Sequence, residues 1–321
     1  MRGYAIRRFL LLIPTLVILT VLVFFFVRFI PGDVIDVMAG QLEQQGGLES
    51  GLGRDKLENA LGLDVPVHVQ YGRWVWGIIT RGDLGTSLWQ QRSLLEIIRP
   101  KLPVTIELSL LSMVLGLLFA VPIGIYAAIR QDTVVDYIMR TVSIMALAIP
   151  AFWLAVLVFI YPARWWNWTP PIEYIPLVEN PLGNLAQFLL PAFIMGLSSS
   201  GSTMRITRTM MLEVMRQDYI RTAWAKGLKE RIVVVRHAVK NTLIPVITIV
   251  GGMIPGLLGG SVIMEQIFCL PGMGRYLLEA VTNRDYNIVS GYNLLMATLV
   301  MLIILVTDLS YAYVDPRIRY R

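Results

Sequence analysis

The chain has 321 residues, of which 55% are hydrophobic and 16% are charged, with a formal net charge of +6. A soluble domain carries about 25% charged residues. The deficit, together with long apolar runs, excludes an ordinary soluble enzyme, a disordered protein and a nucleic-acid-binding protein, and it indicates a polytopic membrane protein. With one cysteine and two histidines, the chain can form neither an intrachain disulfide nor a thiolate metal cluster, and a metal site built from several histidines is not expected.

Six apolar stretches are candidates to cross a bilayer, whose hydrocarbon core of about 30 Å needs roughly 20 residues of helix. The first has a basic start at Arg2, Arg7 and Arg8. Its apolar run exceeds the roughly 7–15 residues of a signal peptide and no small-residue cleavage site follows, so we expect a retained helix. The third and fourth stretches contain Pro150 and Pro191. The six stretches are 9–27, 104–129, 137–160, 185–200, 243–264 and 292–314.

The distribution of basic residues predicts the orientation. An even number of spans places both termini on one side of the membrane. The loop from Arg205 to Lys240 is the most basic part of the chain and would lie on that same side. Because Lys and Arg concentrate in cytoplasmic loops, we expect both termini and this loop to be cytoplasmic, in a multi-pass protein of the inner membrane.

The largest segment outside the predicted spans is 31–103. It combines leucines and tryptophans with turn signals such as Gly82-Asp83, and it is too apolar for a disordered linker. We therefore expect a mostly helical external subdomain, either packed as a lid on the first helix or serving as a docking surface. The predicted organisation is a first transmembrane helix at 1–30, an external subdomain at 31–103 and a five-helix core at 104–321.

The predicted inner loop, at about 202–241, is charged and helical in pattern. Between Met204 and Val239 it has no proline and one glycine, Gly227, which is a helix-ending residue. Two interpretations remain open on the residues alone: an amphipathic helix on lipid headgroups, or a docking helix for a soluble subunit. In the fifth span, Gly252, Gly256 and Gly260 recur at four-residue spacing, a pattern that favours close helix packing.

Several kinds of chemistry have no support in the sequence. No phosphate-binding loop motif occurs, so this chain is not by itself a P-loop ATPase. Ser198–Ser200 has no base in its own segment, since His68 and His237 lie elsewhere. Within the spans, Glu107 and Asp308 are the acidic residues, and both lie near span ends, which argues against a proton-coupled carrier. No catalytic residue, metal ligand or cofactor is predicted.

A series of short motifs carries a resemblance over essentially the whole chain. They are Pro31-Gly32-Asp33, Leu61-Gly62-Leu63-Asp64, Gln70-Tyr71, Gly82-Asp83-Leu84-Gly85-Thr86-Ser87, the 102–108 run, Ile149-Pro150-Ala151-Phe152-Trp153, the 218–228 run, Glu265-Gln266-Ile267-Phe268, Pro271-Gly272-Met273-Gly274-Arg275 and Arg284-Asp285-Tyr286. In this order the chain resembles the B-type permease subunit of the peptide/nickel (oligopeptide/dipeptide) ABC importers. It departs from the family pattern at Trp224 and Asn287, and it has Arg221 at the glutamate position of the coupling loop.

The resemblance implies an all-α polytopic membrane protein with six transmembrane helices of the type I ABC importer kind. The 218–228 run would be the coupling helix that docks on an ATPase. Implied partners are a homologous second permease, two ATP-binding subunits that hold ATP and magnesium, an external substrate-binding protein and membrane lipid, with no nucleic acid. The expected ATPase-coupling residues are Asp218, Tyr219, Arg221, Thr222, Ala223, Trp224, Ala225, Lys226 and Gly227.

The resemblance also implies an external end that meets substrate or the binding protein. Two other functions stay open: a membrane scaffold or sensor that docks a cytoplasmic partner without transport, and a stand-alone carrier. Peptides, nickel complexes, glutathione and oligosaccharides all fit the family as substrates. The candidate external contacts are Asp33, Glu265, Phe268, Pro271, Gly272, Gly274 and Asp285.

Overall fold

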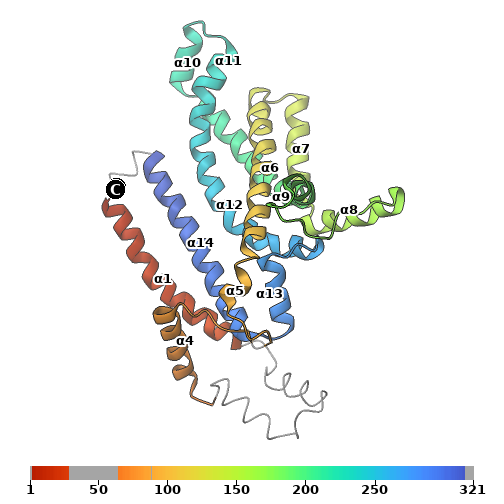
Figure 1. Cartoon of the computed structure of the whole chain (residues 1–321). Coiled ribbons are helices and arrows are strands. Elements are labelled where there is room, and N and C mark those ends of the chain that lie inside the picture. The colour runs from red at the N-terminus through yellow and green to blue at the C-terminus, as the bar shows by residue number, and fades with distance from the viewer. Residues whose placement is uncertain (1, 29–63, 88, 315–321) are drawn as a thin grey trace. The chain divides into compact units, whose positions relative to one another are not determined.

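The computed structural model describes residues 2–28, 64–87 and 89–314, so Asp33 lies outside the described residues. Within these ranges the regular elements are helices, and one isolated bridge joins Thr86 to Ser93. The prediction of an all-α fold is confirmed (Figure 1). The elements are α1 (Arg2–Arg28), α4 (Val67–Arg81), α5 (Leu94–Ile98), α6 (Leu102–Ile129), α7 (Val134–Ala148), α8 (Ala151–Trp166), α9 (Pro181–Met215), α10 (Asp218–Ala225), α11 (Glu230–Ile232), the π-helix η1 (Val233–Val239), α12 (Lys240–Ile267), α13 (Met273–Thr282) and α14 (Tyr286–Val314).

Five of these helices, α1, α6, α9, α12 and α14, are long and apolar enough to cross a membrane. A sixth span exists if the pair α7 and α8, which is bent by 89°, is counted as one. The prediction of a continuous third helix over 137–160 is therefore wrong. Pro150 has no N–H to donate and pushes the preceding residue out of the helical region, and Ile149 has the extended angles φ −88° and ψ 119°.

The fourth span is much longer than the predicted 185–200, since α9 runs for 35 residues. Its N-terminus is capped by Asn180, whose Oδ1 accepts a hydrogen bond from Gly183 N at 2.9 Å. Its polar second half stays within the fold, because Thr203 and Thr207 are fully buried. The helix ends at Met215, and two residues separate it from the start of α10 at Asp218.

The chain forms two compact units, and the domain boundaries expected from the sequence stay predictions. Of the described residues, one unit comprises 101–275 with 303–314, and the other comprises 2–28, 64–87 and 89–100 with 276–302. In the second unit, α1 packs on α4 through aromatic rings: the Phe24 ring lies 5.2 Å from that of Tyr71 and 5.6 Å from that of Trp74. Thr20 Oγ1 and the Tyr71 hydroxyl share a 2.9 Å hydrogen bond at the same contact.

The first unit is organised by the close packing of α6 on α9. A Cβ added to Gly116 would lie 2.9 Å from Gly196 O, and one added to Gly124 would lie 2.7 Å from Met204 O. Such distances are too short for a side chain, so the two backbones can approach only because these positions are glycine. Gly201 lies equally close to Ser143 O and brings α7 against α9.

The glycines predicted to pack, Gly252 and Gly256, have no atom of another helix within 4 Å of an added Cβ. Gly260 meets only Met195 Cε, at 4.0 Å. The described residues leave the face of α12 at these glycines uncovered, and the role of the glycines in packing stays a prediction.

A buried ion pair ties α7 to α9. Arg208 donates from Nε to Asp136 Oδ1 at 2.7 Å and from Nη2 to Oδ2 at 2.6 Å. Asp136 is fully buried and also accepts a hydrogen bond from Asp132 N at 3.1 Å. The two-point geometry satisfies the carboxylate, which would otherwise be a buried charge without compensation.

Replacing one partner of this pair should destabilise the chain strongly. Arg208→Ala leaves Asp136 buried and unpaired, at a cost of about 3–5 kcal/mol in the free energy of unfolding. Arg205→Ala removes an exposed arginine from the same helix and is the matched control. The measurement is thermal unfolding of the full chain in detergent. A double variant, Arg208→Ala with Asp136→Ala, should lose less than the sum of the single changes, and strict additivity would contradict the pairing.

Candidate functional site

The predicted coupling segment forms a short helix, α10, whose two ends have clear physical causes. Gln217 precedes it in an extended conformation, and Asp218 in the first turn complements the helix dipole. At the other end Gly227 N donates to Trp224 O at 2.9 Å, and Gly227 has φ +73°, the left-handed region that favours glycine. In Figure 1, α10 and α11 lie together at one end of α12.

One face of α10 is buried against the chain itself. Ile220 is fully buried and Ala223 is 6% exposed. They belong to a cluster with residues from the end of α6, the end of α9 and η1. We call this cluster the α10 clamp; its other buried members are Ala128, Met211, Val233, Val234 and Ala238. Because residues of α6, α9 and η1 pack against α10, a shift of α10 would displace the parts of these three elements that contact it.

The other face of α10 is exposed. Tyr219 and Trp224 are each 42% exposed, and Asp218 pairs with Arg221 at 3.4 Å in full contact with solvent. An exposed pair of this kind contributes less than about 1 kcal/mol, so both charges are available to a partner. Aromatic and arginine side chains are enriched in protein interfaces. The remaining exposed members of the predicted set are Thr222, Ala225, Lys226 and Gly227.

The π-helix η1 follows α10 and was not predicted from the sequence. The side chain of Asn241 spans this region, because its Nδ2 donates to His237 O at 2.8 Å and lies 3.0 Å from the Tyr219 hydroxyl. That contact links the exposed face of α10 to the start of α12. π-Helical turns occur frequently at functional sites, but no residue pattern in the sequence distinguishes η1 from an ordinary helix.

Glu265, a predicted external contact, is completely buried. Thr105 Oγ1 donates to its Oε1 at 2.7 Å, and Arg275 N donates to its Oε2 at 3.0 Å. Thr105 Oγ1 in turn accepts from Met273 N at 2.9 Å. The carboxylate therefore caps the N-terminus of α13, where the helix dipole favours negative charge. A Cβ on Gly272 would overlap this carboxylate, so the glycine makes room for it.

The neighbouring predicted contacts form a packed corner between α12 and α13. Phe268 is buried, with its ring 5.1 Å from that of Phe159. Gly274 packs so tightly that an added Cβ would lie 2.6 Å from Val262 Cα. Pro271 is half-buried. The corner thus owes its composition to packing within the chain, and its contact with an external partner stays a prediction.

Asp285 is also buried, in the second unit, where two distant motifs meet. Ser87 Oγ donates to Asp285 Oδ2 at 2.6 Å, and Trp89 Nε1 donates to Asn283 O at 2.9 Å. Gly291 leaves space for Leu84 O, which an added Cβ would overlap. The segment 82–94 therefore docks on the corner between α13 and α14, about 200 residues further along the chain.

Two further side chains complete this corner. Asn287, where the family pattern has proline, donates from Nδ2 to Thr86 O at 3.5 Å. Burial, together with the negative charge of Asp285, raises the pKa of Tyr276 to about 12, so Tyr276 carries no charge at neutral pH.

Among the described residues, no group of three or more histidine, cysteine, aspartate or glutamate side chains could hold a metal ion.

Ser87→Ala should loosen the docked segment. It removes the hydroxyl donor to a buried carboxylate, a hydrogen bond to a charged group worth about 1.5–3 kcal/mol. We expect faster amide hydrogen exchange across residues 82–94, measured by mass spectrometry on the full chain. Thr86→Ala, at the neighbouring exposed side chain, is the control and should leave exchange unchanged. Equal exchange in both variants would show that the Ser87–Asp285 contact does not hold the segment.

The chain matches two family models that together cover nearly its whole length. Residues 120–320 match the model described as "Binding-protein-dependent transport system inner membrane component". Residues 1–109 match the model of the N-terminal region of such membrane components.

Full-length relatives carry transport names. A Brucella abortus (strain 2308) chain, named for a peptide transport system permease, is 38% identical over 320 residues, which is 100% of both chains. Dipeptide transport system permease proteins DppB are 36% identical over 340 residues in Alkalihalophilus pseudofirmus and 34% identical over 347 residues in Escherichia coli K12, with 100% of each chain covered. A solved amino acid ABC transporter with histidines aligns at a TM-score of 0.49 and 13% identity, over 69% of this chain and 94% of that chain.

Proposed function

This chain belongs to the family of inner membrane components of binding-protein-dependent transport systems, and we propose that it is the permease subunit of a peptide importer driven by ATPases that dock on α10. The full-length relatives named for peptide and dipeptide transport support the substrate class. Small peptides are the proposed cargo. The chain performs no bond chemistry in this proposal, and hydrolysis of magnesium-bound ATP takes place on the partner subunits.

The proposed complex contains this chain, a homologous second permease, two ATP-binding subunits and an external substrate-binding protein. The two permeases would form the path between them. The uncovered face of α12 at Gly252 and Gly256 supports a second membrane subunit, because helices with small residues at four-residue spacing pack closely on one another. Both termini and α10 would face the cytoplasm, in keeping with the basic residues of the 205–240 region.

The observation that carries this proposal is the two-faced structure of α10. On its inner face, Ile220 and Ala223 pack against α6, α9 and η1. On its outer face, Tyr219, Arg221 and Trp224 are exposed to solvent. An ATPase bound to the outer face would therefore move the ends of two spans and the start of α12 as it closes on ATP. Rigid-body motion of this kind converts a distant binding event into an opening and closing path.

Substitutions at two alanines of α10, one exposed and one buried, distinguish an effect on docking from an effect on folding. Ala225 is exposed and Ala223 is buried. Ala225→Trp should preserve the melting temperature of the chain yet abolish peptide-stimulated ATP hydrolysis in the reconstituted complex, because the bulk blocks the outer face. Ala223→Trp should lower the melting temperature instead, since overpacking costs about 1–3 kcal/mol or more. Normal peptide stimulation of ATP hydrolysis in Ala225→Trp would show that the ATPase does not dock on this face.

The glycine after α10 allows a second test with its own strain control. Gly227→Ala and Gly227→Trp both place a side chain at φ +73° and share the conformational cost, of order 1–2 kcal/mol. An added Cβ meets nothing within 4 Å in the chain itself. Only the tryptophan should therefore block a docked subunit, and peptide uptake into vesicles should be lost in Gly227→Trp but kept in Gly227→Ala.

The outcomes of this experiment also separate the alternatives. Equal uptake by the two Gly227 variants would contradict docking at the end of α10. A membrane scaffold would give no peptide uptake even with the unmodified chain and all partners present. A stand-alone carrier would take up peptide without any ATPase.

A further inference from the structure

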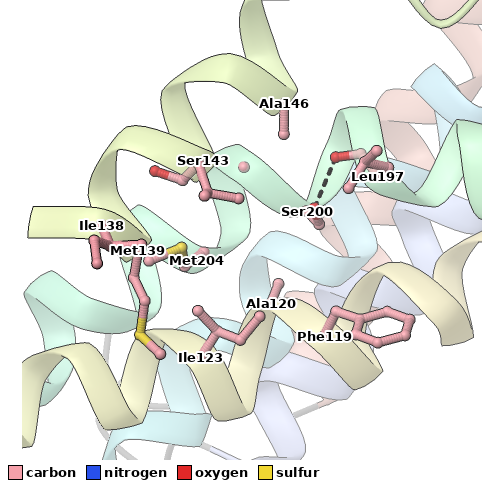
Figure 2. Close-up of a pocket in the computed structure, with 12 residues that line it drawn as sticks. Phe119, Ala120, Ile123, Ile138, Met139, Ser143, Ala146, Leu197, Ser200 and Met204 are labelled. Atoms are coloured by element: carbon pink, nitrogen blue, oxygen red, sulfur yellow. Dashed lines mark hydrogen bonds between the residues drawn. The ribbon is translucent and has the colours of Figure 1, made fainter. Parts of the chain in front are cut away.

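A groove between α6, α7 and α9 lies apart from the coupling surface and from the two capped carboxylates. Its volume is about 260 Å³, against roughly 30 Å³ per water molecule in the liquid. Figure 2 shows its walls: Ile138, Met139 and Ala146 on α7 face α6 and α9 across the space. The other lining residues are Phe119, Ala120, Ile123, Val142, Ser143, Leu197, Ser200, Gly201 and Met204.

The groove is lined mainly by apolar side chains, with few groups that can form hydrogen bonds. Its two hydroxyls are both turned to their own helices: Ser143 Oγ donates to Arg140 O at 2.7 Å. Ser200 Oγ donates to Leu197 O at 2.7 Å, the bond that Figure 2 shows as a dashed line. A solute such as a peptide would find only these two hydroxyl oxygens, and no free donor, among the lining residues to replace its hydration, and burying its polar groups without partners is costly. An apolar chain would meet no such cost.

The groove has the length and direction of one leaflet. From Ile138 to Ala146 it follows α7 for about 12 Å by the rise of a helix, against roughly 15 Å of hydrocarbon in half a bilayer. The end at Ile138 lies toward α10, since α7 begins five residues after α6 ends and Ala128 of α6 is part of the α10 clamp. The groove thus runs from that membrane surface toward the bilayer centre.

A cation, Arg140, follows Ile138 by two residues on α7 and lies beside the groove without lining it. A second hollow, along α7 alone, shares Ile138 and Val142 with the groove and is also lined by Tyr137. The Arg140 guanidinium lies 5.6 Å from the centre of the Tyr137 ring and forms no ion pair among the described residues. Arg208, by contrast, is held by Asp136. Arginine binds phosphate oxygens in a two-point geometry, and tyrosine favours the headgroup level.

We propose that this groove is a binding site for an anionic phospholipid, with one acyl chain between α6, α7 and α9 and its phosphate at Arg140. The proposal needs these helices to lie in a bilayer and does not depend on the cargo or on the ATPase. It assigns the lipid to the leaflet on the α10 side of the membrane. A lipid held in this way differs from the surrounding bulk lipid in staying bound through purification.

The test is native mass spectrometry of the full chain, purified in mild detergent with equal amounts of phosphatidylglycerol and phosphatidylethanolamine added. The unmodified chain should retain one lipid, preferentially phosphatidylglycerol. Ala146→Phe fills the groove and should abolish retention, whereas Ala148→Phe, on the same helix but outside the lining, should not. Val142→Trp fills the groove from an exposed position and covers the case in which Ala146→Phe fails to fold.

The headgroup contact has its own matched pair of variants. Arg140→Gln should reduce the preference for phosphatidylglycerol about fivefold, the effect of roughly one basic residue near an anionic surface. Arg164→Gln, at an exposed arginine near the C-terminal end of α8, should leave the preference unchanged.

Three results would overturn the proposal. Equal retention by Ala146→Phe and Ala148→Phe, or by Val142→Trp and the unmodified chain, would mean that only non-specific lipid is bound. An unchanged preference for phosphatidylglycerol in Arg140→Gln would show that Arg140 does not bind the lipid phosphate. Cross-linking of Val142→Cys to a second permease in the assembled complex would show that a protein segment occupies the groove.

Discussion

The contact of α6 with α9 is the constraint on which the larger unit depends. Two glycines of α6, Gly116 and Gly124, lie against the backbone of α9 at separations that admit no side chain. Without a hydrophobic driving force between helices in lipid, such close packing supplies the attraction. It also explains how α9 remains helical for 35 residues despite its polar second half, because Thr203 and Thr207 are buried rather than exposed to lipid or water. The continuous helix then leads directly to α10.

Three buried carboxylates connect elements far apart in the sequence, and each receives its donors from another element. Asp136 on α7 is held by Arg208 on α9, Glu265 on α12 by Thr105 on α6 and the backbone of α13, and Asp285 before α14 by Ser87. A buried charge without partners is costly, whereas a satisfied one fixes geometry. These residues therefore position helices. Two of the acids predicted as external contacts, Glu265 and Asp285, are buried within this chain, and their contact with an external partner stays a prediction.

The sequence predicted the helical membrane fold because hydropathy over 20 residues depends little on tertiary detail. It could not predict the length of α9, since whether Thr203 and Thr207 face a partner helix depends on a neighbour that lies distant in the chain. The four-residue glycine spacing at Gly252 and Gly256 suggested packing, yet the two α6 glycines that lie against α9 are eight residues apart, at Gly116 and Gly124. The burial of Glu265 and Asp285 likewise required the three-dimensional positions of Thr105 and Ser87.

The division of α10 into two faces clarifies why its departures from the family pattern do not disturb the fold. Arg221 and Trp224 lie on the exposed face, whereas Ile220 and Ala223 fill the α10 clamp. The chain's own stability therefore constrains the inner residues, which must be apolar and, at Ala223, small. The outer residues contribute little to that stability, so their identity is set by whatever surface they meet. In the docking proposed above, a bulky Trp224 requires a matching recess on the partner's surface, because its ring is 42% exposed and is not covered by the α10 clamp.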